Sequence, residues 1–100
     1  MEDSSTVELV AEIATKLEMA GIYTDDARLA SEHILITCLI KDYEVDIRLK
    51  YLLNKTADEI LLQGFTWKNT PEGFKYWSIV RVSMLVLWKQ KDCHESDRDN

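Results

Sequence analysis

Cysteine is scarce in this sequence, and no segment has the composition of a secretory leader or a membrane anchor. Cys38 and Cys93 are the two cysteines, and their spacing matches no metal motif. Cys38 lies in the apolar run "ILITCLI", where a thiol behaves as a small hydrophobic side chain. No apolar run reaches the roughly 18 to 20 residues that a membrane helix needs. These absences predict a reduced, cytoplasmic protein.

The motifs of the common catalytic sites are also missing. The sequence has no phosphate-binding glycine loop, no nucleophile elbow and no HExxH pattern. His33 and Cys38 are the only base and nucleophile in the ordered part, and five positions along one helix direct them about 140° apart. We therefore expect a buried thiol, an imidazole at or near the surface, and no catalytic residue. We therefore hypothesise that the protein is not an enzyme and has no cofactor.

A short acidic cluster raises the question of a cation site. Asp42, Glu44 and Asp46 alternate along the chain. A calcium loop also needs a glycine turn and further ligands, and neither follows these three residues. The cluster therefore predicts a solvated charged face and no metal site.

Basic residues are few in the first third of the chain, where acids predominate. The net charge is −6, and residues 1–32 hold eight acidic against two basic residues. The segment 92–100 holds four acidic residues and one basic residue. Such charge repels nucleic acid and anionic membranes and favours a protein partner with a basic face, although solubility alone also explains it.

Hydrophobic residues make up 46% of the chain and charged residues 30%, which is typical of one small globular domain. The spacing of apolar residues predicts a first helix over Thr6–Ala20. Ser5 and Glu8 have the pattern of a capping box at its start. Gly21 supplies the left-handed residue that ends it.

Two further helices follow from similar signals. The first begins at Thr24, with Asp25 and Asp26 against the positive helix end, and continues to about Lys41. Its half around "ILITCLI" is expected to be buried on most sides. A second capping-box pattern, Thr56 to Glu59, begins a short helix that Gly64 ends.

The segment between these helices is ambiguous. Apolar and charged residues alternate strictly over 43–51, which is the pattern of a half-exposed strand. A hairpin with "ILITCLI" is possible in principle, but the turn at Lys41 and Asp42 lacks the glycine or asparagine that hairpins favour. We favour a helical or irregular segment. The whole chain then predicts an all-α fold, a compact bundle of about four helices in one domain over 1–91, with a flexible acidic tail at 92–100. The alternative is an α+β fold with a short hairpin in 34–51.

The only proline and two of the three glycines fall in "GFTWKNTPEGFKYW", residues 64–77. Thr70 and Pro71 have the pattern of a helix start. Glycine within a helix costs about 1 kcal/mol relative to alanine, so Gly73 needs a steric reason. We expect the ring of Phe65 or Trp67 to lie against the first turn of this helix.

The helix that starts at Pro71 is expected to continue to about Gln90. It is apolar on nearly all sides, with Phe74, Trp77, Val80, Met84, Leu87 and Trp88 on one broad stripe. A strand over "IVRVSMLVLW" is the alternative. Because a small domain cannot cover such a helix all round, we expect a homodimer. Its interface would be formed by Val82, Leu85, Val86 and Trp88.

The aromatic segment 64–77 resembles a pattern found in other proteins. Its pattern resembles one in small uncharacterised bacteriophage proteins: Phe-x-Trp, two residues, Thr-x-x-Gly, two residues, aromatic-Trp. The match covers about a seventh of the chain and implies phage origin and a compact helical fold, with no assigned chemistry. The matching residues are Phe65, Trp67, Thr70, Gly73, Tyr76 and Trp77.

Three functions remain as hypotheses. The first is a non-enzymatic phage accessory protein that binds and modulates or inhibits a host protein in the host cytoplasm. The second is nucleotide binding or sequestration by Trp67, Tyr76 and Trp77 at the aromatic corner. The third is a helix-turn-helix DNA binder, which the acids of its second helix disfavour. The contact face for the host protein would be formed by Glu8, Glu12, Glu18, Asp25, Asp26 and Glu32.

Overall fold

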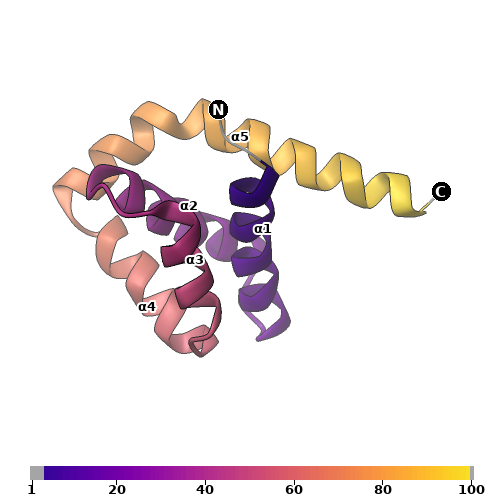
Figure 1. Cartoon of the computed structure of the whole chain (residues 1–100), viewed down its shortest axis with the longest axis horizontal. Coiled ribbons are helices and arrows are strands. Elements are labelled where there is room, and N and C mark those ends of the chain that lie inside the picture. Colours follow the sequence, from indigo (N-terminus) through magenta and orange to yellow (C-terminus); the bar gives the residue numbers. More distant parts are fainter. Residues whose placement is uncertain (1–3, 100) are drawn as a thin grey trace.

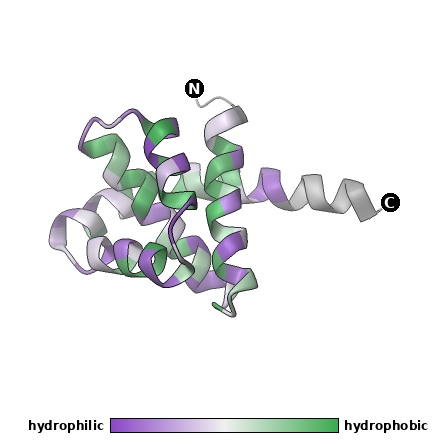
Figure 2. Ribbon diagram, turned by 60° about the horizontal axis from the view of Figure 1, so that its bottom comes forward, coloured by the Kyte–Doolittle hydropathy of each residue, from purple (hydrophilic) through white to green (hydrophobic). Residues whose placement is uncertain are grey.

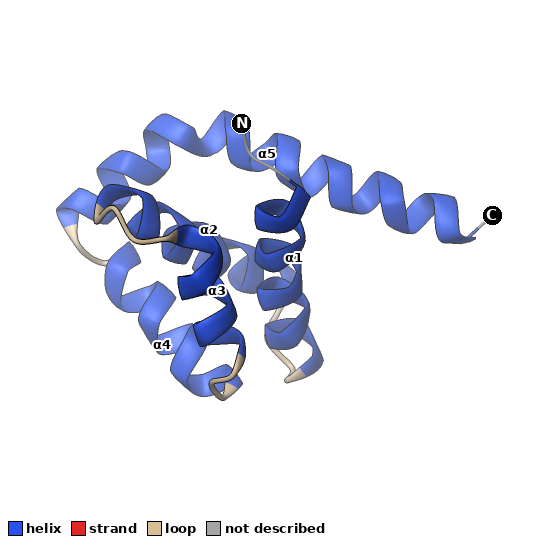
Figure 3. Ribbon diagram, in the orientation of Figure 1, coloured by secondary structure: helices blue, strands red, loops and turns tan. Residues whose placement is uncertain are grey.

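A computed structural model of the chain describes residues 4–99, and this part of the chain is helical without any strand (Figures 1 and 3). The predicted all-α class is confirmed, and the alternative hairpin in 34–51 is wrong. The described part has five helices where about four were predicted. They are α1 (Ser4–Met19), α2 (Thr24–Ile40), α3 (Val45–Leu53), α4 (Ala57–Lys68) and α5 (Pro71–Asp99).

Helix α2 is the centre of the fold: like α1 it packs against each of the other four helices, and it holds the unbroken run of buried residues 30–38. Every residue from 31 to 38 is buried, which agrees with the expectation for the "ILITCLI" half. Hydrophobic and hydrophilic residues are interleaved along the helices in Figure 2, as expected for amphipathic helices around a shared core. None of the helices in 4–99 has the length and apolar character that crossing a bilayer requires.

The helix starts depart from the predicted caps in two places. Helix α1 already includes Ser5, so Ser5 lies inside the helix rather than at its N-cap. In α2 the N-cap is Tyr23, whose side chain makes no capping bond, and Thr24 is the first helical residue. The capping box at Thr56 and Glu59 is confirmed by its two reciprocal hydrogen bonds, of 3.0 and 3.2 Å.

Residues 43–51 turn out to be mainly helical, as favoured, despite their alternating pattern. In α3, Leu49 and Leu52 face the core and Val45 packs against it, whereas Ile47 and Tyr51 are exposed. The alternation therefore does not separate buried from exposed residues. Helix α3 is also joined to α1 at both ends. Thr6 donates to Asp46 at 2.6 Å, and the Lys16 ammonium donates to the Leu53 carbonyl at 2.7 Å.

Gly64 was expected to end a helix, and the structure corrects this. It lies inside α4, where an added Cβ would be 2.7 Å from both the Cβ and the carbonyl oxygen of Ala30. Helices α2 and α4 therefore cross with their backbones almost in contact. Glycine is required at this position by the approach of another helix rather than by a turn.

The corner between α4 and α5 is held by Thr70. Its hydroxyl accepts from the Gly73 amide at 2.9 Å and donates to the Trp67 carbonyl at 2.8 Å. A Cβ at Gly73 would be 2.1 Å from that same carbonyl oxygen. The steric reason for Gly73 is therefore the backbone carbonyl of Trp67, where the sequence predicted an aromatic ring.

Helix α5 lies across the other helices, and its C-terminal end extends past them (Figure 1). Met84, Leu87 and Trp88 are buried. Phe74, which was predicted to lie on the same apolar stripe, is exposed. The helix runs to Asp99, well beyond the predicted Gln90 and through the predicted tail. The side chains of that tail lie outside the described residues.

Candidate functional site

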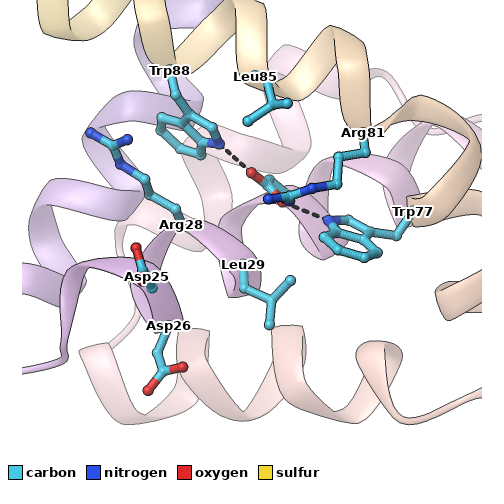
Figure 4. Close-up of a pocket in the computed structure, with 9 residues that line it drawn as sticks. Asp25, Asp26, Arg28, Leu29, Trp77, Arg81, Leu85 and Trp88 are labelled. Atoms are coloured by element: carbon cyan, nitrogen blue, oxygen red, sulfur yellow. Dashed lines mark hydrogen bonds and ion pairs between the residues drawn. The ribbon is translucent and has the colours of Figure 1, made fainter.

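A cavity of about 350 Å³ lies between the N-terminal half of α2 and the middle of α5. Figure 4 shows charged and aromatic side chains from these two helices converging on it. Its volume is within the range of small-ligand pockets, about 300 to 1,000 Å³. The lining residues are Asp25, Asp26, Arg28, Leu29, Glu32, Trp77, Arg81, Leu85 and Trp88.

The wall of this cavity contains a buried carboxylate. Glu32 is 2% exposed, and its two oxygens accept hydrogen bonds from different indoles. Trp77 donates to Oε1 at 2.6 Å, and Trp88 donates to Oε2. Arg81 adds an ion pair, with Nη1 at 3.8 Å from Oε1. A carboxylate can be buried only with such compensation, because leaving water costs several kcal/mol.

Each indole is also covered by an arginine. The Arg28 guanidinium is 5.0 Å from the centre of the Trp88 ring, and that of Arg81 is 4.7 Å from the centre of the Trp77 ring. Cation–π contacts of this kind contribute about 0.5–1 kcal/mol at exposed sites. Figure 4 shows the two arginines and the two tryptophans as a mixed wall of charge and aromatic surface. Three of them, Trp77, Arg81 and Trp88, contact Glu32 directly.

His33, the neighbour of Glu32, is fully buried rather than at the surface as expected. Its ring stacks on Trp77 at 5.6 Å, and neither ring nitrogen has a hydrogen-bond partner. Burial, with a smaller effect from Lys68, lowers the pKa of His33 to about 4. The imidazole is therefore neutral at physiological pH.

Cys38 is buried, as expected, and burial raises its pKa to about 11. It is therefore a thiol rather than a nucleophilic thiolate at neutral pH. Within the described residues no group of three or more His, Cys, Asp and Glu side chains is gathered as a metal ion would need.

The six acids proposed as a contact face are in three different environments. Glu8, Glu12, Asp25 and Asp26 are exposed. Glu18 is half-buried, and its carboxylate lies 3.9 Å from the Lys91 ammonium. Glu32 is enclosed by the two indoles and is not available to a macromolecular partner. Asp25 and Asp26 are the acids that combine exposure with a place in the cavity lining.

The proposed aromatic corner is divided between two places. Trp77 lines the 350 Å³ cavity, whereas Trp67 lines a different cavity of about 110 Å³. Phe65 packs against the core, and Tyr76 is exposed. Thr70 and Gly73 have the structural role described above. These aromatic side chains do not form one stacking site.

The link between Glu32 and the tryptophans was not predicted from the sequence. Two signals were available. Glu32 precedes an apolar run, and Trp77 and Trp88 are eleven positions apart, which is about three helical turns and places them on one face. Neither signal shows that Glu32 and the tryptophans contact one another, because the bonded residues are 45 and 56 positions apart in the sequence.

Comparisons with protein-family models, with curated proteins and with solved structures found no significant match to this chain.

Substitution of Glu32 tests the buried carboxylate. Glu32→Ala leaves two indole N–H groups without an acceptor, so the free energy of unfolding should fall by about 3 kcal/mol or more. Glu32→Gln should cost less, since its oxygen can still accept one of the bonds. Urea unfolding measures both changes. Glu12→Ala, at an exposed acid, should stay within about 0.5 kcal/mol. Wild-type stability in Glu32→Ala would contradict the assignment.

The buried histidine predicts a dependence of stability on pH. The folded pKa of about 4 is below the usual 6.5, so between these values the unfolded chain binds a proton that the folded chain does not. Stability is full above pH 6.5 and should fall by roughly 3 kcal/mol on acidification to pH 4, at 1.36 kcal/mol per pH unit. In urea titrations from pH 7 to 5, His33→Phe should flatten this slope. An unchanged slope would contradict the prediction.

Proposed function

We propose that this chain is a non-enzymatic phage accessory protein that binds a host protein and modulates or inhibits it. The observation that carries the proposal is the position of Asp25 and Asp26. Both are exposed, and both line the open cavity whose walls are the rings of Trp77 and Trp88. This arrangement is suited to an anchoring side chain from a partner rather than to a flat contact.

The chemistry of the cavity indicates which side chain would enter. Asp25 and Asp26 at its edge attract a cation, while the two guanidiniums that also line it are engaged elsewhere: Arg28 lies over Trp88, and Arg81 lies over Trp77 and pairs with Glu32. Leu29 and Leu85 offer apolar surface beside them (Figure 4). Arginine and lysine combine a charged end with an apolar stem, so they can use both features. A partner with a basic surface segment is therefore favoured. Exposed Glu8 and Glu12 on α1 add to the attraction of such a partner.

Phage origin and a place in the host cytoplasm belong to the same proposal. They are supported by the resemblance of the segment from Phe65 to Trp77 to small phage proteins. Two positions of that pattern, Thr70 and Gly73, have a definite structural role at the start of α5.

Charge reversal at the cavity tests this function. Asp25→Lys with Asp26→Lys should abolish retention of a basic host protein on the immobilised chain, because attraction becomes repulsion at the anchoring point. The measurement is a pull-down from bacterial lysate, followed by identification of the retained protein and titration with that purified protein. A loss of at least about tenfold in affinity is expected for two reversed charges.

A matched control is available on other helices. Asp58 and Glu72 are exposed acids in the first turns of α4 and α5, as Asp25 and Asp26 are in α2. Asp58→Lys with Glu72→Lys therefore makes the same change of net charge, also at acids in the first turns of helices. Binding should survive in this control. Equal loss in both double variants, each folded by circular dichroism, would contradict a site at the cavity.

We also propose that the exposed face of α5 pairs with a second copy of the chain. Ile79 is 65% exposed and Val82 is 73% exposed, and Leu85 and Val86 lie on the same helix with about half of their surface in solvent. Full burial of a fully exposed side chain of this kind is favourable by roughly 1.5–3 kcal/mol, and each of these partly buried side chains would gain a fraction of that. Trp88, which the sequence placed on this face, is buried inside the domain.

Sedimentation equilibrium tests the pairing. We expect a mass of twice 11.6 kDa at tens of micromolar. Val82→Lys with Val86→Lys should give the monomer, since charge would be buried in the interface. Asn54→Lys with Asn69→Lys adds the same charge at exposed polar positions outside α5 and should leave the dimer intact. A monomeric wild-type protein would overturn this proposal.

A further inference from the structure

The second cavity, at the other end of α2, has a different chemistry from the first. It has a volume of about 110 Å³ and lies between the C-terminal half of α2, the loop after it, α3 and α4. No acidic residue lines it. The lining residues are Ile34, Thr37, Cys38, Lys41, Tyr43, Arg48, Leu52, Gln63, Thr66 and Trp67.

Two cations lie at this cavity without a carboxylate partner among the described residues. Lys41 and Arg48 form no ion pair there, and aromatic rings hold them instead. The Lys41 ammonium is 5.6 Å from the centre of the Trp67 ring, and the Arg48 guanidinium is 5.2 Å from that of Tyr43. Cations held in this way keep their hydrogen-bond donors for a ligand.

An unsatisfied donor lies in the same wall. The indole nitrogen of Trp67 is buried and has no hydrogen-bond partner. The other two tryptophans both donate to Glu32. A buried N–H without an acceptor costs about 1–3 kcal/mol, so a ligand that supplies one would be favoured. The nitrogen is enclosed in protein, and Trp67 is one of the residues that line the cavity.

The volume limits the size of the ligand. Water in the liquid occupies about 30 Å³ per molecule, so 110 Å³ corresponds to between three and four waters. A tetrahedral oxyanion is of this size. An adenine ring with its ribose is too large to be enclosed here.

The negative end of α2 lies close to this cavity and would oppose an anion. Three of the last four carbonyls of α2 are, however, occupied. Those of Thr37, Cys38 and Leu39 accept from the backbone amides of Lys41, Tyr43 and Asp42 at 3.0 to 3.3 Å. Two full positive charges outweigh the partial charge of a helix end.

We propose that this cavity binds a small oxyanion of the phosphate type, either free or as the phosphoryl group of a small metabolite. Lys41 and Arg48 neutralise its charge, and the Trp67 N–H donates to one of its oxygens. This site is independent of the contact with a host protein, which uses the opposite half of α2.

Nuclear magnetic resonance of the indole groups tests the site directly. The chain has three tryptophans, and single Trp→Phe variants assign the three indole N–H signals of ¹⁵N-labelled protein. Inorganic phosphate, titrated at constant ionic strength against chloride, should move the Trp67 signal downfield until it saturates. The Trp77 and Trp88 signals should stay in place, because their bonds to Glu32 do not change. Glycerol phosphate, titrated in parallel, distinguishes a free anion from a phosphoryl group.

Matched variants separate the site from general attraction of anions. Arg48→Gln should weaken the saturable shift by at least about tenfold, as expected for losing a hydrogen bond to a charged group. Lys50→Gln makes the same change of charge at an exposed position of the same helix outside the cavity, and it should bind normally. Lys41→Gln gives a second test should Arg48→Gln fail to fold. Absence of a saturable Trp67 shift with both anions, or equal weakening by Lys50→Gln, would overturn the proposal.

Discussion

The carboxylate of Glu32 is the constraint on which the arrangement of α2 and α5 depends. It is buried in the central helix, and it can remain there because two indoles and an arginine from α5 compensate its charge. The burial of Glu32 and the docking of α5 therefore depend on each other. The stack of His33 on Trp77 and the contact of Arg28 with Trp88 add to the same junction.

Much of the fold follows from local signals in the sequence. Gly21 has the positive φ of 97° expected of a residue that ends a helix. The capping box at Thr56 and the helix start at Thr70 also form with the expected hydrogen bonds. These features depend on residues within three or four positions of one another, so a single sequence contains the information for them.

The features that were missed depend on distant partners. Gly64 has the pattern of a helix end, yet Ala30, from another helix, explains it. Glu32 was placed on an exposed face with the other acids of residues 1–32, because the indoles that make its burial possible are 45 and 56 positions away. The alternation over 43–51 left the type of that segment open for a similar reason. The surface that α3 buries is set by α1 and α2, against which it packs.

The close crossing of α2 and α4 limits which residues can occupy position 64. An added carbon at position 64 would meet not only the side chain of Ala30 but also its Cα, at 2.8 Å, and its carbonyl oxygen. A change of residue 30 cannot remove backbone atoms, so no compensating substitution there would admit a larger residue at 64. Position 73 faces a backbone carbonyl in the same way. Glycine at these two positions is therefore a requirement of the backbone itself, which no change in a neighbouring side chain can relieve.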